Sequence, residues 1–243
     1  MTRTIRTALC ALTALTFAAP SHADDTGFEL LAIGELSSNQ SDYAALSVRM
    51  PLLAKDGSDR RVAFEGLRLR FDVSRSSYDT GYDGIDGRGS ATTFRGALSY
   101  GIGLSNSAAL TLVGGVSYRE TQVRPVSPSA PPDVSRTGAF AAAELQILLP
   151  EYGNVQMLLE HDQTSGSYGA ITYLHSIGSL RMGPTLTYFS EGNYSQSRAG
   201  VVAAFDLVED IEVRMTATRG WASVGGVESD AVYTVQGQLR FAF

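Results

Sequence analysis

Few side chains in this sequence are suited to catalysis. Apart from His22 near the N-terminus, the histidines are His161 and His175. Some membrane β-barrels hydrolyse lipids with a histidine and a serine that face the membrane together. Ser176 follows His175 directly, but consecutive residues of a strand point to opposite faces. The residue two positions after His161 is Gln163 and not serine. We therefore expect no catalytic dyad, and we expect that the protein is not an enzyme.

Arginine is the second chemically distinctive residue type. It supplies 18 of the 19 basic residues, and Lys55 is the remaining one. A guanidinium binds a carboxylate through two parallel hydrogen bonds, so arginines can pair with the protein's own acids or bind anionic solutes. Many of these arginines recur at alternate positions of apolar segments. Their role therefore depends on the structure that those segments form.

The segments have the period of β-strands. From Asp24 onward, apolar residues alternate with polar or small ones. In the clearest case, the apolar residues at 233, 235, 239 and 241 alternate with Thr, Gln, Gln and Arg at 234, 236, 238 and 240. The most apolar run, 139–149, contains Glu144 and Gln146 and is far shorter than the roughly 20 residues of a membrane-spanning helix. Twelve alternating segments begin near residues 28, 42, 62, 91, 108, 135, 154, 168, 179, 197, 210 and 231.

Two architectures are built from strands with this alternation of apolar and polar residues. A soluble β-sandwich turns its apolar faces to a dry core, whereas a membrane barrel turns them to lipid. Segments of about 10 residues suit strands that cross an outer membrane, and single-chain bacterial barrels have even strand numbers. Tyr233, Phe241 and Phe243 lie on one face of the last segment, which resembles the signal read by the barrel assembly machinery. We predict an all-β, antiparallel up-and-down transmembrane β-barrel of about 12 strands in the bacterial outer membrane, in contact with lipid and lipopolysaccharide.

The connections between segments support this strand count. Periplasmic turns of such barrels are short and outer loops are long. The predicted periplasmic connections are short except for the first, at 53–60, and the others are 104–107, 150–153, 176–178 and 207–209. The predicted outer loops include 76–90, 121–134 and 222–230. We expect 76–90, which is rich in Gly, Ser and Asp, to form a flexible hairpin tip.

The polar faces of the strands place a set of charges inside the barrel. We predict that the lumen is lined by Arg68, Arg70, Arg95, Arg119, Glu144, Arg181, Arg198, Glu212, Arg214 and Arg240, together with Arg49, Asp72, Glu160 and Asp206. Two interpretations are open. The charges pair with one another and hold the wall together, or the arginines form a path for anionic solutes. No pattern of metal ligands or of a cofactor site accompanies them, so we expect neither.

The first 23 residues have the pattern of a secretory signal peptide. Arg3 and Arg6 precede an apolar stretch, and Ser-His-Ala at 21–23 is a small-x-small cleavage site. Residues 24–243 would then form the barrel. Cys10, the one cysteine, lies in the signal segment, so we expect no disulfide in the mature chain. The formal net charge of −6 argues against a nucleic-acid partner.

Two stretches carry a family resemblance. In 110–149 a strand with a small-residue pair and an aromatic precedes a proline-rich acidic loop, and a small-residue strand with Glu144 follows. In 182–205 a Gly-Pro step enters a strand, an E-G-x-Y hairpin follows, and R-x-G precedes an apolar strand. These features resemble the cellulose biosynthesis protein BcsS family of alphaproteobacteria, over residues 60–243. The resemblance implies a non-catalytic outer-membrane accessory of cellulose or exopolysaccharide biosynthesis or export, with the cellulose synthase complex or the polysaccharide as partner.

Two other functions also fit the residues. A small monomeric porin would pass acidic oligosaccharides through an Arg-lined lumen. Its anion-selective conductance would fall when Arg95 and Arg214 are replaced by Ala. A structural or adhesive barrel would instead act through the loop 121–134 and would lose its function when that loop is deleted.

Overall fold

The computed structural model describes residues 27–54, 66–82, 85–124, 133–149, 151–208, 210–228 and 231–242. The strands in these ranges are β1 (Glu29–Ser37), β2 (Asp42–Ala54), β3 (Gly66–Tyr82), β4 (Ile85–Ser105), β5 (Ala108–Arg124), β6 (Val134–Leu149), β7 (Gly153–Asp162), β8 (Gly166–Ile177), β9 (Leu180–Glu191), β10 (Tyr194–Val208), β11 (Ile211–Val224), β12 (Val227–Glu228) and β13 (Val232–Ala242). No helix in the described ranges is long and apolar enough to cross a membrane. The predicted signal peptide, 1–23, and Phe243 lie outside them.

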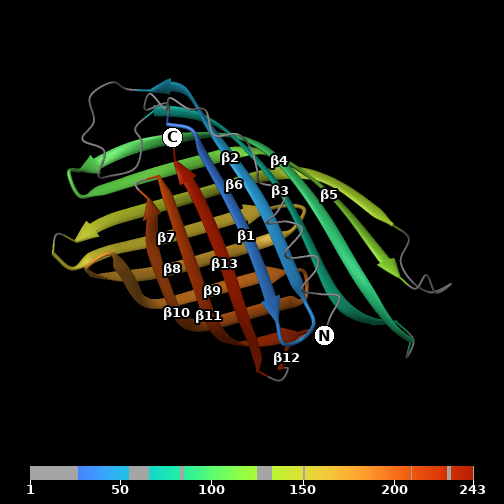
Figure 1. The fold of residues 1–243 in the computed structure, drawn as a ribbon. Helices are drawn as coiled ribbons and strands as arrows, with labels where there is room; N and C mark the ends of the chain where they lie inside the picture. The colour runs from blue at the N-terminus through green and yellow to red at the C-terminus, as the bar shows by residue number, and fades with distance from the viewer. Residues whose placement is uncertain are drawn as a thin grey trace.

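The long strands form one closed antiparallel sheet. Each pairs with its neighbours in the chain from β1 to β11, while the two-residue β12 only extends the hairpin that follows β11. β13 pairs with β11 on one side and with β1 on the other, from Glu29↔Ala242 to Ser37↔Thr234. Figure 1 shows β1 between β2 and β13 in the wall. The structure confirms the predicted antiparallel β-barrel of 12 strands.

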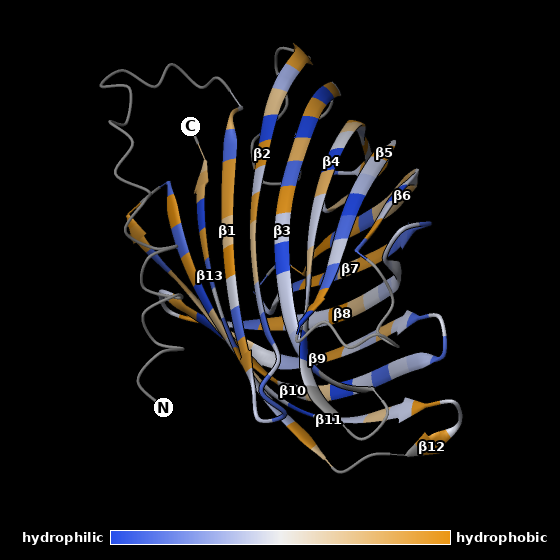
Figure 2. Cartoon of the chain, turned by 90° about the vertical axis from the view of Figure 1, so that its right-hand side faces the viewer, coloured by the Kyte–Doolittle hydropathy of each residue, from blue (hydrophilic) through white to orange (hydrophobic). Residues whose placement is uncertain are grey.

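The outer surface of the barrel is apolar. Large side chains exposed on it include Phe94 (50%), Val116 (64%) and Leu159 (62%). Figure 2 shows hydrophobic and hydrophilic residues alternating along the strands, as a wall between lipid and a polar interior requires. An apolar belt of this kind is unfavourable in water and favourable in a bilayer. The belt therefore marks the membrane-spanning part of the barrel.

The strand positions follow the alternation closely. Eleven of the twelve predicted starts lie within four residues of the observed ones, and β4 begins six residues earlier than predicted. The pattern of β1 is weak because Leu31 and Ile33 lie on the same face as Glu29 and Glu35. Two apolar side chains therefore point into the barrel beside two carboxylates, and the regular alternation disappears.

The segment 76–90 is not the flexible hairpin tip that its composition predicts. β3 and β4 remain paired as far as Tyr82↔Ile85, so nearly all of it is regular strand. The Tyr78 ring covers Gly89, where an added Cβ would collide with that ring. Arg88 also forms an ion pair with Asp42 of β2 at 2.8 Å. Cross-strand contacts thus hold Gly- and Ser-rich residues in a sheet, although their intrinsic preference is for turns.

The two ends of the barrel differ in their connections. Two-residue turns at 106–107 and 178–179 lie at the end that holds Glu29 and Ala242, and we take the opposite end, to which the longest strands extend, as the outer side. At the other end β3, β4 and β5 extend as a long ribbon. The expectation that outer connections are longer than periplasmic ones does not hold for 38–41, 163–165 and 192–193, which are short turns at that end. Most of 121–134 either continues β5 or lies outside the described residues.

Candidate functional site in the barrel lumen

The inner face carries all the residues that the sequence assigns to the lumen. Paired residues of neighbouring strands point to the same side, so pairs such as Asp72↔Arg95 and Glu212↔Arg240 identify the inner face on both sides of the barrel. The structure places on it Arg68, Arg70, Arg95, Arg119, Glu144, Arg181, Arg198, Glu212, Arg214 and Arg240, as well as Arg49, Asp72, Glu160 and Asp206.

Glu144 of β6 is the centre of one cluster. Arg49 of β2 donates from Nη1 to Oε2 at 3.1 Å and from Nη2 to Oε1 at 2.8 Å. Arg70 of β3 donates from Nη1 to Oε1 at 3.0 Å, and its Nε also meets Asp72 at 2.9 Å. Neither β2 nor β3 neighbours β6 in the sheet. These bonds therefore cross the interior instead of running along the wall.

A second carboxylate, that of Glu29, lies within 4.0 Å of three arginines near the periplasmic end. Arg240 donates from Nε at 3.1 Å, and nitrogens of Arg68 and Arg49 lie 3.9 and 4.0 Å from its Oε2. Its residue surface is only 5% exposed. The cluster therefore ties the closing strand β13 to β1, β2 and β3 through one buried acid.

Arg95 of β4 is the centre of a third cluster, in the outer part of the lumen. It forms ion pairs of 2.8 Å with Glu160 and 2.7 Å with Asp162, both on β7, and its guanidinium lies 4.6 Å from the centre of the Phe140 ring. The Asp162 carboxylate also accepts hydrogen bonds from the Ser117 hydroxyl and from the backbone and hydroxyl of Thr164. This carboxylate thereby fixes the outer turn 163–165 to β4 and β5.

Further contacts cross the interior from the remaining strands. Arg198 of β10 meets Glu35 of β1 at 2.7 Å. Arg214 of β11 donates to Gln156 of β7 at 2.8 Å. The other crossing and flanking pairs are Arg119–Glu191 at 2.6 Å, Arg181–Glu212 at 2.8 Å, Arg214–Glu212 at 3.0 Å and Arg181–Asp206.

Most arginines on the inner face of the described strands are paired with carboxylates. Nine arginines on the inner face each form at least one ion pair, namely Arg49, Arg68, Arg70, Arg95, Arg119, Arg181, Arg198, Arg214 and Arg240. Their partners are also nine: Glu29, Glu35, Asp72, Glu144, Glu160, Asp162, Glu191, Asp206 and Glu212. Each of these guanidiniums therefore already has a carboxylate partner within the protein. The geometry favours the interpretation in which the charges hold the wall together.

The sequence interpretation missed four of these acids. Asp162 lies two residues after Glu160 and so shares its face, a signal that alternation alone supplies. Glu191 lies at the outer end of β9, beyond the apolar part of that strand. Glu29 and Glu35 belong to β1, whose weak alternation hid its inner face.

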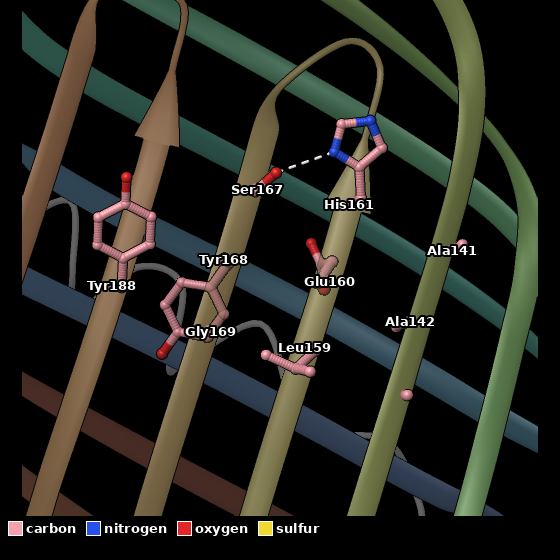
Figure 3. Close-up of a pocket in the computed structure, with 10 residues that line it drawn as sticks. Ala141, Ala142, Leu159, Glu160, His161, Ser167, Tyr168, Gly169 and Tyr188 are labelled. Carbon is pink, nitrogen blue, oxygen red and sulfur yellow. Dashed lines mark hydrogen bonds between the residues drawn. The ribbon is translucent and has the colours of Figure 1, made fainter.

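The structure also brings together a histidine and a serine that the sequence spacing did not connect. His161 of β7 and Ser167 of β8 are cross-strand partners, and His161 Nδ1 lies 2.9 Å from Ser167 Oγ (Figure 3). The sequence analysis compared each histidine only with serines close to it in the same strand, whereas this serine comes from the neighbouring strand; a hydrogen bond between the two side chains does not by itself make a catalytic dyad. His175 instead contacts the backbone oxygen of Tyr152 at 2.7 Å. Within the described ranges, no group of His, Cys, Asp and Glu is arranged to hold a metal ion.

Comparison with known proteins yields structures and no sequence relatives. No protein-family model and no curated protein matches the sequence. The COG4313 outer membrane channel from Pseudomonas putida F1 superposes with a TM-score of 0.53 at 12% identity, covering 93% of this chain and 100% of that one. The transport unit of the autotransporter AIDA-I from Escherichia coli gives 0.50 at 8% identity, covering 98% and 97%. The KdgM porin gives 0.46 at 7% identity, covering 88% and 99%.

The fold is that of an outer-membrane barrel. At these identities the similarity concerns the fold alone, and the apolar belt independently requires a bilayer around it. The protein therefore lies in the bacterial outer membrane, where its outer face contacts lipid and lipopolysaccharide.

Proposed function

We propose that the protein is a non-catalytic accessory barrel of cellulose or exopolysaccharide biosynthesis or export, with the cellulose synthase complex or the polysaccharide as partner. The observation that carries the proposal is the self-paired lumen. Arg49 and Arg70 reach across to Glu144, and Arg198 reaches across to Glu35. These side chains bridge strands that are not neighbours in the sheet, so they lie across the lumen.

The resemblance of residues 110–149 and 182–205 to the BcsS family supports the cellulose part of the proposal. Cellulose is a neutral and bulky chain, so lumenal arginines would have no charge to recognise in it. A narrow, bridged interior is also a poor conduit for such a polymer. We therefore assign the arginines to wall stability, and we assign the accessory role to the surfaces of the barrel.

The experiment that tests the proposal compares cellulose yield in a strain that lacks the gene with that in its complemented parent. We expect a clear loss that complementation restores. An unchanged yield would remove the cellulose role and leave the barrel without this assignment.

A small porin for acidic oligosaccharides is the second candidate, and nine arginines on the inner face are the observation that favours it. Single-channel recording of the purified barrel in planar bilayers separates the two functions. The accessory barrel is expected to conduct weakly. Robust anion-selective conductance that falls in Arg95→Ala and Arg214→Ala variants would favour the porin.

A further inference from the structure

The His161–Ser167 pair faces the membrane at the outer ends of its strands. His161 is the second-last residue of β7, and Ser167 is the second residue of β8. The two neighbours of His161 in the chain, Glu160 and Asp162, point into the lumen and bind Arg95. Alternation therefore turns the histidine and its serine partner to the lipid side.

A hollow lies in the apolar belt beside this pair. Figure 3 shows Ala141 and Gly169 at this hollow, with Leu159 and Tyr188 beside them. The small residue Ala143 also lines the hollow. Its volume of about 440 Å³ lies within the range of small-molecule sites, about 300–1,000 Å³. Leu159 and Tyr188 are 62% and 48% exposed, so large side chains stand next to three positions that lack them. The belt therefore has a shallow, open depression here.

The hydrogen bond within the pair leaves one donor for a ligand. If Ser167 donates to His161 Nδ1, the neutral imidazole keeps its Nε2–H; if Nδ1–H donates, the serine keeps its O–H. A donor at the lipid surface is costly when it has no acceptor. An acyl ester carries a carbonyl acceptor at the end of an apolar chain, so it matches both the donor and the hollow below it.

We propose that this hollow binds an acyl ester of a membrane lipid. The chain lies against Ala141, Ala143 and Gly169, and the ester carbonyl accepts a hydrogen bond from the His161–Ser167 pair. The site stands on the opposite face of the wall from the lumen, so it does not depend on the function proposed above.

The site binds the ester and does not hydrolyse it. A serine nucleophile needs a histidine held by a second acceptor, and it needs donors for the oxyanion. The lipid-facing positions of β6 and β9 in the described ranges include no carboxylate to hold the imidazole. The nearest acids, Glu160 and Asp162, are committed to Arg95 in the lumen.

Lipid titration of the purified barrel in detergent micelles, read by native mass spectrometry, tests the site. The probes are a diacyl phosphatidylethanolamine and its dialkyl ether analogue, which has the same chains without the ester carbonyls. We expect the wild type to bind the ester about three- to ten-fold more tightly, the value of one hydrogen bond. The double variant His161→Leu with Ser167→Ala is expected to lose this preference. Ala143→Leu, which fills the hollow, is expected to weaken binding of both lipids.

Matched controls lie on the same outer face away from the hollow. Ser197→Ala and Ala217→Leu make the same kinds of change on β10 and β11 and are expected to leave both affinities unchanged. Heat-modifiable migration in gels verifies that each variant is folded before it is titrated. Equal affinity of the wild type for ester and ether lipids would overturn the ester contact, and unchanged binding by Ala143→Leu would overturn the hollow. If the wild type releases fatty acid from the ester lipid and Ser167→Ala does not, the site hydrolyses the ester, and the proposal of binding without hydrolysis is wrong.

Discussion

The lumenal arginines bind carboxylates through several nitrogens of the planar guanidinium group. Arg49 places two nitrogens on the two oxygens of Glu144, an arrangement that a lysine ammonium, which is a single point charge, cannot reproduce. Arg70 then uses Nη1 for Glu144 and Nε for Asp72. One guanidinium can thus connect strands that do not pair in the sheet. This property makes arginine, and not lysine, suited to the inner-face positions that bridge strands.

Glu144→Gln tests whether the lumenal arginines are held by acids. The amide removes a negative charge that two guanidiniums share, so the interior gains a net positive charge. We expect the small residual conductance in planar bilayers to rise and to become anion-selective, as judged by the reversal potential in a salt gradient. Glu151→Gln, on an exposed periplasmic turn, is the matched control and should change neither quantity. An unaltered reversal potential in the lumen variant would contradict a lumen held by these pairs.

Asp162→Ala tests the stabilising role of a buried acid. Its side chain is fully buried, binds Arg95 and accepts hydrogen bonds from Ser117 and Thr164, and the substitution removes all of these contacts together, although Arg95 keeps its ion pair with Glu160. We expect the free energy of unfolding to fall by about 3–5 kcal/mol, measured by urea titration in lipid vesicles through the fluorescence of the one tryptophan, Trp221. Asp210→Ala, at an exposed turn, should change it by no more than about 0.5 kcal/mol. A loss below about 1 kcal/mol in the lumen variant would show that other contacts hold the outer turn.

At the scale of the strands, the alternation of apolar and polar residues predicts the barrel wall, because odd and even positions of a strand face opposite sides, one the lipid and the other the lumen. It therefore located eleven strand starts and the inner-face arginines. The alternation did not predict features that depend on contacts between strands or on mixed residue types within one face. Tyr78 over Gly89 extends β3 and β4 beyond the alternating part, and Leu31 beside Glu29 breaks the pattern of β1. The His161–Ser167 pair depends on the register of β7 against β8, which no pattern within a single strand contains.

Adjacent glycines on β5 give a prediction at this scale. A Cβ on Gly115 would lie 2.6 Å from the Ala97 Cα and would collide with the Gly96 carbonyl of β4, whereas a Cβ on Gly114 would meet nothing within 4 Å. We expect Gly115→Ala to lower the free energy of unfolding in vesicles by about 1–3 kcal/mol, as overpacking does. Gly114→Ala, one residue away, should not lower it. Equal effects of the two changes would mean that the close approach of β4 and β5 is not tight at this position.

At the scale of the whole molecule, closure depends on the last strand. β13 pairs with both β1 and β11, and Arg240 on it reaches Glu29 on β1. The sheet has two open edges until this strand is in place, and such edges favour association with other chains. Tyr233 and Phe241 lie on its lipid-facing side, while Phe243 falls outside the described residues. The strand that completes the wall is therefore also the strand that carries the predicted assembly signal.

Deletion of Phe243 separates these two roles. If the terminal aromatic is read by the assembly machinery, its loss should reduce the folded, heat-modifiable barrel in outer membranes several-fold. Spontaneous refolding of the same variant into lipid vesicles should match the wild type, because the pairs of β13 with β1 and β11 extend from Val232 to Ala242 without it. Phe243→Tyr keeps an aromatic at the end and should assemble normally in cells. Normal amounts of the deletion variant in outer membranes would count against the signal. A defect in vesicles as well would assign Phe243 to the stability of the barrel, since no assembly machinery is present there.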